Sequence, residues 1–168
     1  MTEAEIILYL QRSFSSPIGK GFVVFSARWL IYLLIPFVLM LRLFPKMRDV
    51  FLPSCWAALL AFATTSVIAG IVHRVRPYLA GAGIHALVPP NLQSGSFPSS
   101  HTAIAAAIAA AITTTHPIIG CIACIIAIVI AFGRVAAGMH YPSDVIGGAA
   151  IGLLSALIVR AVQEGMVR

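Results

Sequence analysis

The chain has 168 residues, of which 60% are hydrophobic and 10% are charged, and its mean hydropathy is +1.00. A soluble domain usually carries about 25% charged residues, so the composition excludes a soluble globular protein and indicates an integral membrane protein. The net charge of +6 is not gathered into a basic stripe, so nucleic acid is not an expected partner. The length accommodates one bundle, and we expect a single domain over residues 1–168.

The first twenty residues predict an amphipathic helix on the membrane surface, over 1–20. Thr2 and Glu5 have the spacing of a capping box, and the apolar residues Ile6, Ile7, Leu8 and Leu10 follow. A lipid-sensing arm is the functional alternative for this segment. The first residues are acidic rather than basic, which argues against a signal peptide.

Five apolar runs follow, each close to the ~20 residues that cross a ~30 Å hydrocarbon core. They therefore predict an all-α fold, an integral membrane bundle of about five transmembrane helices. The runs are Phe22 to Leu43, Val50 to Val72, Ser99 to Thr115, Pro117 to Gly138 and Pro142 to Val162. The third is rich in alanine, which suits a central helix. Gly147, Gly148 and Gly152 suggest close helix approach in the fifth run, but this spacing leaves homo-oligomerisation open.

Counting crossings places the polar stretches at one membrane surface, together with Arg74, Arg76, His101, Arg134, His140 and Asp144. The opposite face carries Arg42, Lys46, Arg48, Arg160 and Arg168, against Arg12, Lys20 and Arg28 on the polar face. Positive residues favour the cytoplasmic side. We therefore expect the polar face to lie outside the cell.

The segment GRVAAGMHYPSD, from Gly133 to Asp144, contains an arginine, a histidine and an aspartate between two apolar runs. His140 and Asp144 are four residues apart, so they share a face if a helix begins here. An aspartate at that offset can hold one imidazole nitrogen and leave the other free to attack. Arg134 offers a bidentate fork suited to phosphate.

Two further stretches carry polar groups at run ends. FPSSHTA, from Phe97, opens a helix with Ser99, Ser100 and His101, a favourable anion site; alone, His101 is equally typical of a core histidine. HRVRPYLAG, from His73, places Arg74 and Arg76 beyond a helix end. Arginines there are also typical of interfacial anchors.

Together these stretches resemble the signature of the type 2 phosphatidic-acid phosphatase superfamily, which shares its site with vanadium haloperoxidases. Arg76-Pro77 matches the end of its first motif, Pro98 to His101 the second, and Arg134, His140 and Asp144 the third. The resemblance spans residues 69–148, the motif-bearing core. Gly133 and Ser100 replace the usual Ser and Gly. Ala69 stands where the motif has a lysine, a loss that Arg74 or His73 would have to offset.

The resemblance implies a metal-independent lipid phosphatase without a cofactor. His140 would attack phosphorus, with Asp144 orienting it, and His101 would protonate the leaving oxygen. Arg76, Arg134, Ser99, Ser100 and Arg74 would bind the phosphoryl oxygens. The chain offers no carboxylate cluster for a metal.

The small bundle with an outward-facing site resembles bacterial undecaprenyl-pyrophosphate phosphatases, which implies a bacterial plasma membrane and undecaprenyl pyrophosphate as substrate. Phosphatidylglycerophosphate, phosphatidate and lipid A 1-phosphate are the alternatives. A different class is a catalytically inactive, lipid-binding membrane protein, which only Ala69 favours.

Overall fold

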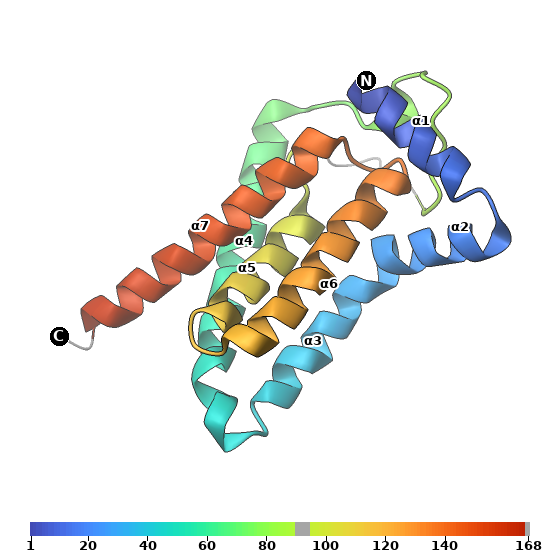
Figure 1. Ribbon diagram of the computed structural model, residues 1–168. Helices are drawn as coiled ribbons and strands as arrows, with labels where there is room; N and C mark the ends of the chain where they lie inside the picture. The colour runs from blue at the N-terminus through green and yellow to red at the C-terminus, as the bar shows by residue number, and fades with distance from the viewer. Residues whose placement is uncertain (90–94, 167–168) are drawn as a thin grey trace.

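The computed structural model describes residues 1–89 and 95–166, and the regular structure in this part of the chain is entirely helical (Figure 1). The predicted all-α fold is therefore confirmed. In chain order the elements are α1 (Glu3–Ser13), α2 (Pro17–Val24), the π-helical segment η1 (Phe25–Trp29), α3 (Leu30–Leu41), the 3-10 segment η2 (Pro45–Val50), α4 (Phe51–Val72), the 3-10 segment η3 (Pro77–Leu79), α5 (Ser100–Thr113), α6 (Pro117–Ala136) and α7 (Pro142–Met166).

The protein is an integral membrane protein. Four stretches of the described chain are long and apolar enough to cross a membrane: Pro17–Leu41, Pro45–Leu79, Pro117–Ala136 and Pro142–Met166. Their outward side chains are large and apolar, as in Leu39, Leu59, Ile71, Ile128 and Leu157. The other predicted crossing forms α5, whose 14 residues span roughly 21 Å and fall short of a full crossing.

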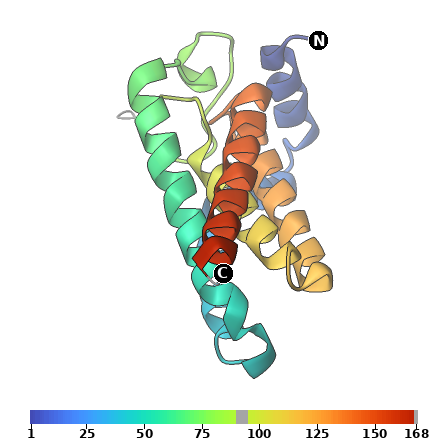
Figure 2. The ribbon, with the colours of Figure 1, turned by 90° about the vertical axis from the view of Figure 1, so that its left-hand side faces the viewer.

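Helix α5 is the centre of the bundle, with α4, α6 and α7 packed around it (Figures 1 and 2). Its alanines are buried, including Ala103 and Ala107. Two glycines let α7 approach closely, because a Cβ at Gly148 or Gly152 would overlap the carbonyl oxygen of Ser99 or Ala103. Small residues thus let the short helix α5, which begins with polar residues, pack closely between longer helices.

The N-terminal helix is shorter than the sequence predicts. The Thr2–Glu5 capping box is confirmed in both directions, with Thr2 N donating to Glu5 over 2.7 Å. However, α1 ends at Ser13, and Ser16 and Pro17 start α2, so the predicted boundary at residue 20 is wrong. Ser16 accepts a hydrogen bond from Gly19 N and so caps a new helix. Helix α1 packs on the bundle through the fully buried Ile7.

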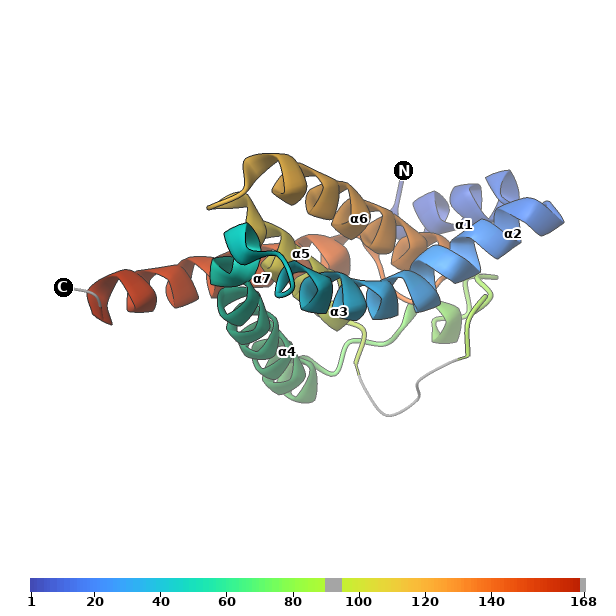
Figure 3. The ribbon, with the colours of Figure 1, turned by 90° about the horizontal axis from the view of Figure 1, so that it is seen from below.

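All the polar motifs meet at one end of the molecule. Helix α1, the segment after α4, the start of α5 and the connection between α6 and α7 gather there (Figure 1), while η2 and the end of α7 lie at the opposite end. Viewed from below, α3 and α4 diverge with α5 between them (Figure 3). Residues of these three helices line a cavity near the polar end.

Candidate active site

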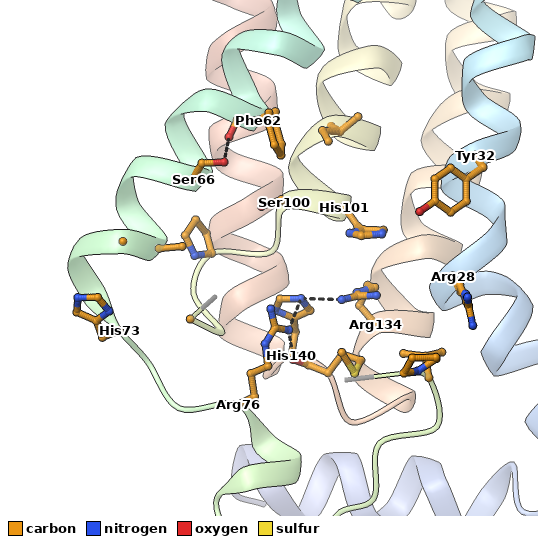
Figure 4. Close-up of a pocket in the computed structure, with 18 residues that line it drawn as sticks. Arg28, Tyr32, Phe62, Ser66, His73, Arg76, Ser100, His101, Arg134 and His140 are labelled. Atoms are coloured by element: carbon orange, nitrogen blue, oxygen red, sulfur yellow. Dashed lines mark hydrogen bonds between the residues drawn. The ribbon is translucent and has the colours of Figure 1, made fainter. Parts of the chain in front are cut away.

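The imidazole of His140 is held in one tautomer. His140 follows a turn at Gly138, whose φ of 72° favours glycine. Its Nδ1 lies 2.7 Å from the carbonyl oxygen of Ser96. A carbonyl only accepts hydrogen bonds, so Nδ1 carries the hydrogen and Nε2 keeps its lone pair. The Nε2 atom faces Arg134 Nη2 at 3.1 Å and Arg76 Nη1 at 3.4 Å (Figure 4).

The same surroundings keep this imidazole neutral. Burial, reinforced by the charges of Arg134 and Arg76, lowers the pKa of His140 to about 4 against the opposing effect of Asp144. A neutral ring with a free Nε2 lone pair is the form of histidine that attacks phosphorus.

Asp144 supports the histidine differently from the sequence-based expectation. Its Oδ2 lies 3.8 Å from His140 Nδ1, close enough to stabilise an imidazolium but too far for a hydrogen bond. Oδ2 instead accepts hydrogen bonds from the Ser96 hydroxyl and from Tyr141 N, the latter over 2.8 Å. Asp144 therefore fixes Ser96, and the carbonyl of Ser96 orients the ring.

Arg134 and Arg76 are buried beside Nε2 of His140, each 6% exposed. Arg134 Nη1 donates to the carbonyl of Ala27 over 3.0 Å, and Arg76 Nη1 donates to that of Met139 over 3.1 Å. Gly133 makes the first contact possible, since a Cβ there would lie 2.7 Å from Ala27 N. Within the described chain, the buried Nε of Arg134 has no hydrogen-bond acceptor. An anion between the two guanidinium groups would supply one.

The predicted phosphate contact from Arg74 does not fit its position. Arg74 Nη1 donates to Asp144 Oδ1 and to the Ser143 hydroxyl, both over 2.6 Å, and Nη2 pairs with Glu3 over 2.7 Å. The guanidinium also stacks 4.2 Å from the ring centre of Tyr141. Two carboxylates hold Arg74 behind the histidine, so it does not replace the missing lysine.

The three residues predicted to form a site at the start of α5 differ in where they lie. Ser100 and His101 line the cavity. Ser99 is fully buried behind it, where its N–H donates to the carbonyl of Asp144 over 3.0 Å and its hydroxyl accepts from Thr102. Ser99 therefore joins α5 to α7 and is not among the residues that line the cavity. The first amides of α5 have no acceptor within their own helix.

These groups surround a cavity of about 640 Å³ between α3, α4 and α5 (Figure 4). Ala69, the position of the absent lysine, lies on its wall together with His73. The described lining includes three arginines, Arg28, Arg76 and Arg134, and no acidic residue. Such a lining favours an anionic ligand. In residues 1–89 and 95–166, no group of three or more His, Cys, Asp or Glu side chains gathers as a metal site would require.

Three residues of this end escaped the sequence reasoning as site residues. Ser96 holds both His140 and Asp144, Glu3 holds Arg74, and Arg28 lines the cavity. Ser96 contacts His140 through its backbone carbonyl, a role that no sequence pattern indicates. The only signal for Arg28 was a charge inside an apolar run, which is typical of functional residues in membranes.

The fold and site define a membrane-embedded helical bundle with a histidine inside a cationic cavity. The chain belongs to the PAP2 superfamily, whose sequence pattern matches residues 51–166. In overall structure it resembles the crystal structure of Aquifex aeolicus LpxE, with a TM-score of 0.81 and 27% identity over 94% of this chain and 93% of that one.

Curated relatives are also similar in sequence. The Bacillus licheniformis protein named bacitracin transport permease protein BcrC is 32% identical over 61% of this chain and 52% of its own length. Undecaprenyl-diphosphatase BcrC of Bacillus subtilis is 35% identical over 47% of this chain and 40% of its own length. The chain thus spans about half the length of these relatives. Decaprenylphosphoryl-5-phosphoribose phosphatase of Mycobacterium tuberculosis is 32% identical over 74% of this chain and 67% of its own length.

Proposed function

We propose that the protein is a phosphatase that removes phosphate from a membrane lipid phosphate or diphosphate through a phosphohistidine. One observation carries this proposal: a neutral imidazole nitrogen faces two buried guanidinium groups inside a cavity whose described lining has no carboxylate. Two adjacent buried guanidinium groups favour an anionic ligand. A phosphoryl group can accept charge-assisted hydrogen bonds from both.

In the first step, the Nε2 lone pair of His140 forms a bond to phosphorus. The bond from phosphorus to the bridging oxygen breaks, and its electron pair stays on that oxygen. Arg76 and Arg134 stabilise the charge on the equatorial oxygens, which is the main task of a phosphoryl-transfer site. Ser100, which lines the cavity at the start of α5, offers its hydroxyl to the same oxygens.

His101 lies on the cavity wall, and in its protonated form it donates a proton to the leaving oxygen. Water then attacks the phosphohistidine and gives a proton to the neutral His101, the N–P bond breaks, and inorganic phosphate leaves. Asp144 stabilises the charged ring through its 3.8 Å approach to Nδ1. Arg74 and Ser96 position Asp144.

The proposed substrate is undecaprenyl diphosphate. The name of the Bacillus subtilis relative supports this lipid, and the cavity at the polar end suits a headgroup whose tail lies in the bilayer. Phosphatidylglycerophosphate, phosphatidate and lipid A 1-phosphate are the alternatives. We place the protein in a bacterial plasma membrane with the site facing the periplasm or exterior.

Phosphate release from these four lipids by purified protein in detergent tests the proposal. We expect release from undecaprenyl diphosphate, an acid-labile phosphoprotein on rapid quenching, and loss of both in His140→Ala. The control is His116→Ala, because His116 lies at the opposite end of the bundle and pairs with Asp49 at 3.4 Å. Residual turnover above a tenth in His140→Ala contradicts the covalent mechanism, and no release from any lipid supports the inactive, lipid-binding alternative.

A further inference from the structure

Arg28 is a cation on the cavity wall that the mechanism above does not use. It lies in η1, its side chain is exposed, and it lines the same cavity as His140 (Figure 4). Its guanidinium lies 5.0 Å from the ring centre of Trp29. Tyr32, one helical turn further along, also lines the cavity and is 57% exposed.

The backbone places Arg28 next to the phosphoryl site. Arg134 donates to the carbonyl oxygen of Ala27 over 3.0 Å, and Arg28 is the next residue. With standard backbone dimensions, the Cα of Arg28 therefore lies within about 6 Å of the Arg134 guanidinium. An arginine side chain is long enough to bring a second guanidinium beside a group bound by the first.

The local helix geometry supports a role in binding. Residues Phe25–Trp29 form a π-helical turn between α2 and α3, and such turns frequently occur at functional sites. Ser26 and Ala27 are buried against α6, while Arg28 faces the open cavity. An arginine within a membrane bundle is costly unless it has a water-filled cavity or an anion to face. The cavity that Arg28 lines provides such a space.

We propose that Arg28 and the Tyr32 hydroxyl form a second anion subsite that binds the inner phosphate of a lipid diphosphate. The terminal phosphoryl group then lies between Arg76, Arg134 and His140. This inference rests on the proposed function and specifies its substrate class. When the bridging P–O bond breaks, its electron pair stays on the inner phosphate. Arg28 neutralises that developing charge, which a monophosphate ester would place on an alkoxide instead.

The first test measures binding of inorganic pyrophosphate and inorganic phosphate to purified protein by calorimetry. The wild type binds pyrophosphate more tightly than phosphate. Arg28→Ala weakens pyrophosphate binding about 10- to 100-fold, the effect of losing a charge-assisted hydrogen bond, and changes phosphate binding less than threefold. Tyr32→Phe has a smaller effect in the same direction. The control Lys20→Ala removes an exposed cation outside the cavity lining and retains the preference.

The second test compares kcat/KM for undecaprenyl diphosphate in the same variants, and Arg28→Lys recovers part of the loss. A wild type without preference for pyrophosphate, or an Arg28→Ala variant that weakens both anions equally or neither, overturns the second subsite. Failure of the proposed function is distinguishable, because it leaves the wild type without phosphate release whatever the anion preference. Thermal unfolding midpoints of all variants verify that each is folded.

Discussion

At the scale of single residues, the neighbours of His140 determine which of its ring nitrogens is the proposed nucleophile. The carbonyl of Ser96 accepts from His140 Nδ1 at 2.7 Å and leaves Nε2 to face the arginines. A carboxylate in direct contact with Nδ1 would favour the charged ring, whereas a neutral carbonyl fixes the tautomer without that effect. With Asp144 Oδ2 at 3.8 Å from Nδ1, the ring stays neutral in the free site, and a carboxylate is near if phosphorylation gives the ring a charge.

The first prediction concerns the protonation of this ring. Burial and the two arginines lower the pKa of His140 to about 4, so its neutral form persists well below the ordinary histidine value near 6.5. Protonation blocks Nε2 only as the pH falls through the lowered pKa. Nitrogen NMR of histidine-labelled protein in detergent measures this directly, with His140→Ala identifying the signal. We expect a neutral ring at pH 5; a titration midpoint near 6.5 contradicts the buried cationic site.

Spacing within one segment predicts part of this site, and long-range contacts determine the rest. Arg134, His140 and Asp144 fall within twelve residues, so their motif is visible in the sequence, and the structure brings them together. The roles of Glu3 and Arg74 depend on a contact across 71 residues. No local pattern shows that a carboxylate on α1 competes for that arginine.

At the scale of elements, side-chain contacts attach α1 to the polar end of the bundle, where the candidate site lies. Glu3 Oε1 accepts from Ser143 N over 2.8 Å, and its Oε2 pairs with Arg74, which holds Asp144. Gln11 adds a second attachment, donating to the carbonyl of His85 over 2.7 Å. Partial burial acts to raise the pKa of Glu3, but the hydrogen bonds from Ser143 and Arg74 outweigh it and lower the pKa. The carboxylate therefore stays charged at neutral pH.

The second prediction tests the attachment of α1 through Glu3 with the variant Glu3→Gln. The Arg74–Glu3 pair is partly exposed, with 31% and 36% of the side chains accessible, so we expect a loss of about 1 kcal/mol. Hydrogen exchange of α1 should quicken about fivefold, and kcat/KM should fall by a similar factor. The control is Glu5→Gln, since glutamine also completes a capping box. Unchanged exchange in Glu3→Gln would show that α1 is held by Ile7 and its apolar neighbours alone.

The fold is more predictable than its boundaries. Apolar runs predict the crossings because a helix that spans the hydrocarbon core must be apolar and about 20 residues long. They extend the third run to Thr115, whereas α5 ends at Thr113, ahead of His116 and Pro117. They also do not reveal the π-helical turn at η1, where Gly133 lets α6 approach Ser26 and Ala27 closely.

At the scale of the whole molecule, the cations at the two ends predict how the protein lies in the membrane. Arg28 lines the cavity, so it belongs with the site arginines and not with the cations that set orientation. The site end then keeps Arg12 and Lys20. The opposite end carries Arg42, Lys46, Arg48 and Arg160, whereas Arg168 lies outside the described residues. Four cations against two strengthen the expectation that the site end faces outward.

The third prediction tests that orientation by labelling cysteines in intact cells. Cys55, Cys121 and Cys124 are first changed to alanine, and one cysteine is then introduced at Ala82 or at Lys46, both exposed and at opposite ends of the bundle. A membrane-impermeant thiol reagent should label Ala82→Cys in intact cells and Lys46→Cys only after permeabilisation. Because the cavity lies near the polar end, where the segment after α4 also lies, this pattern would place the proposed phosphatase site at the outer leaflet. The reverse pattern would place the site at the cytoplasmic leaflet. It would contradict the orientation inferred from the charges.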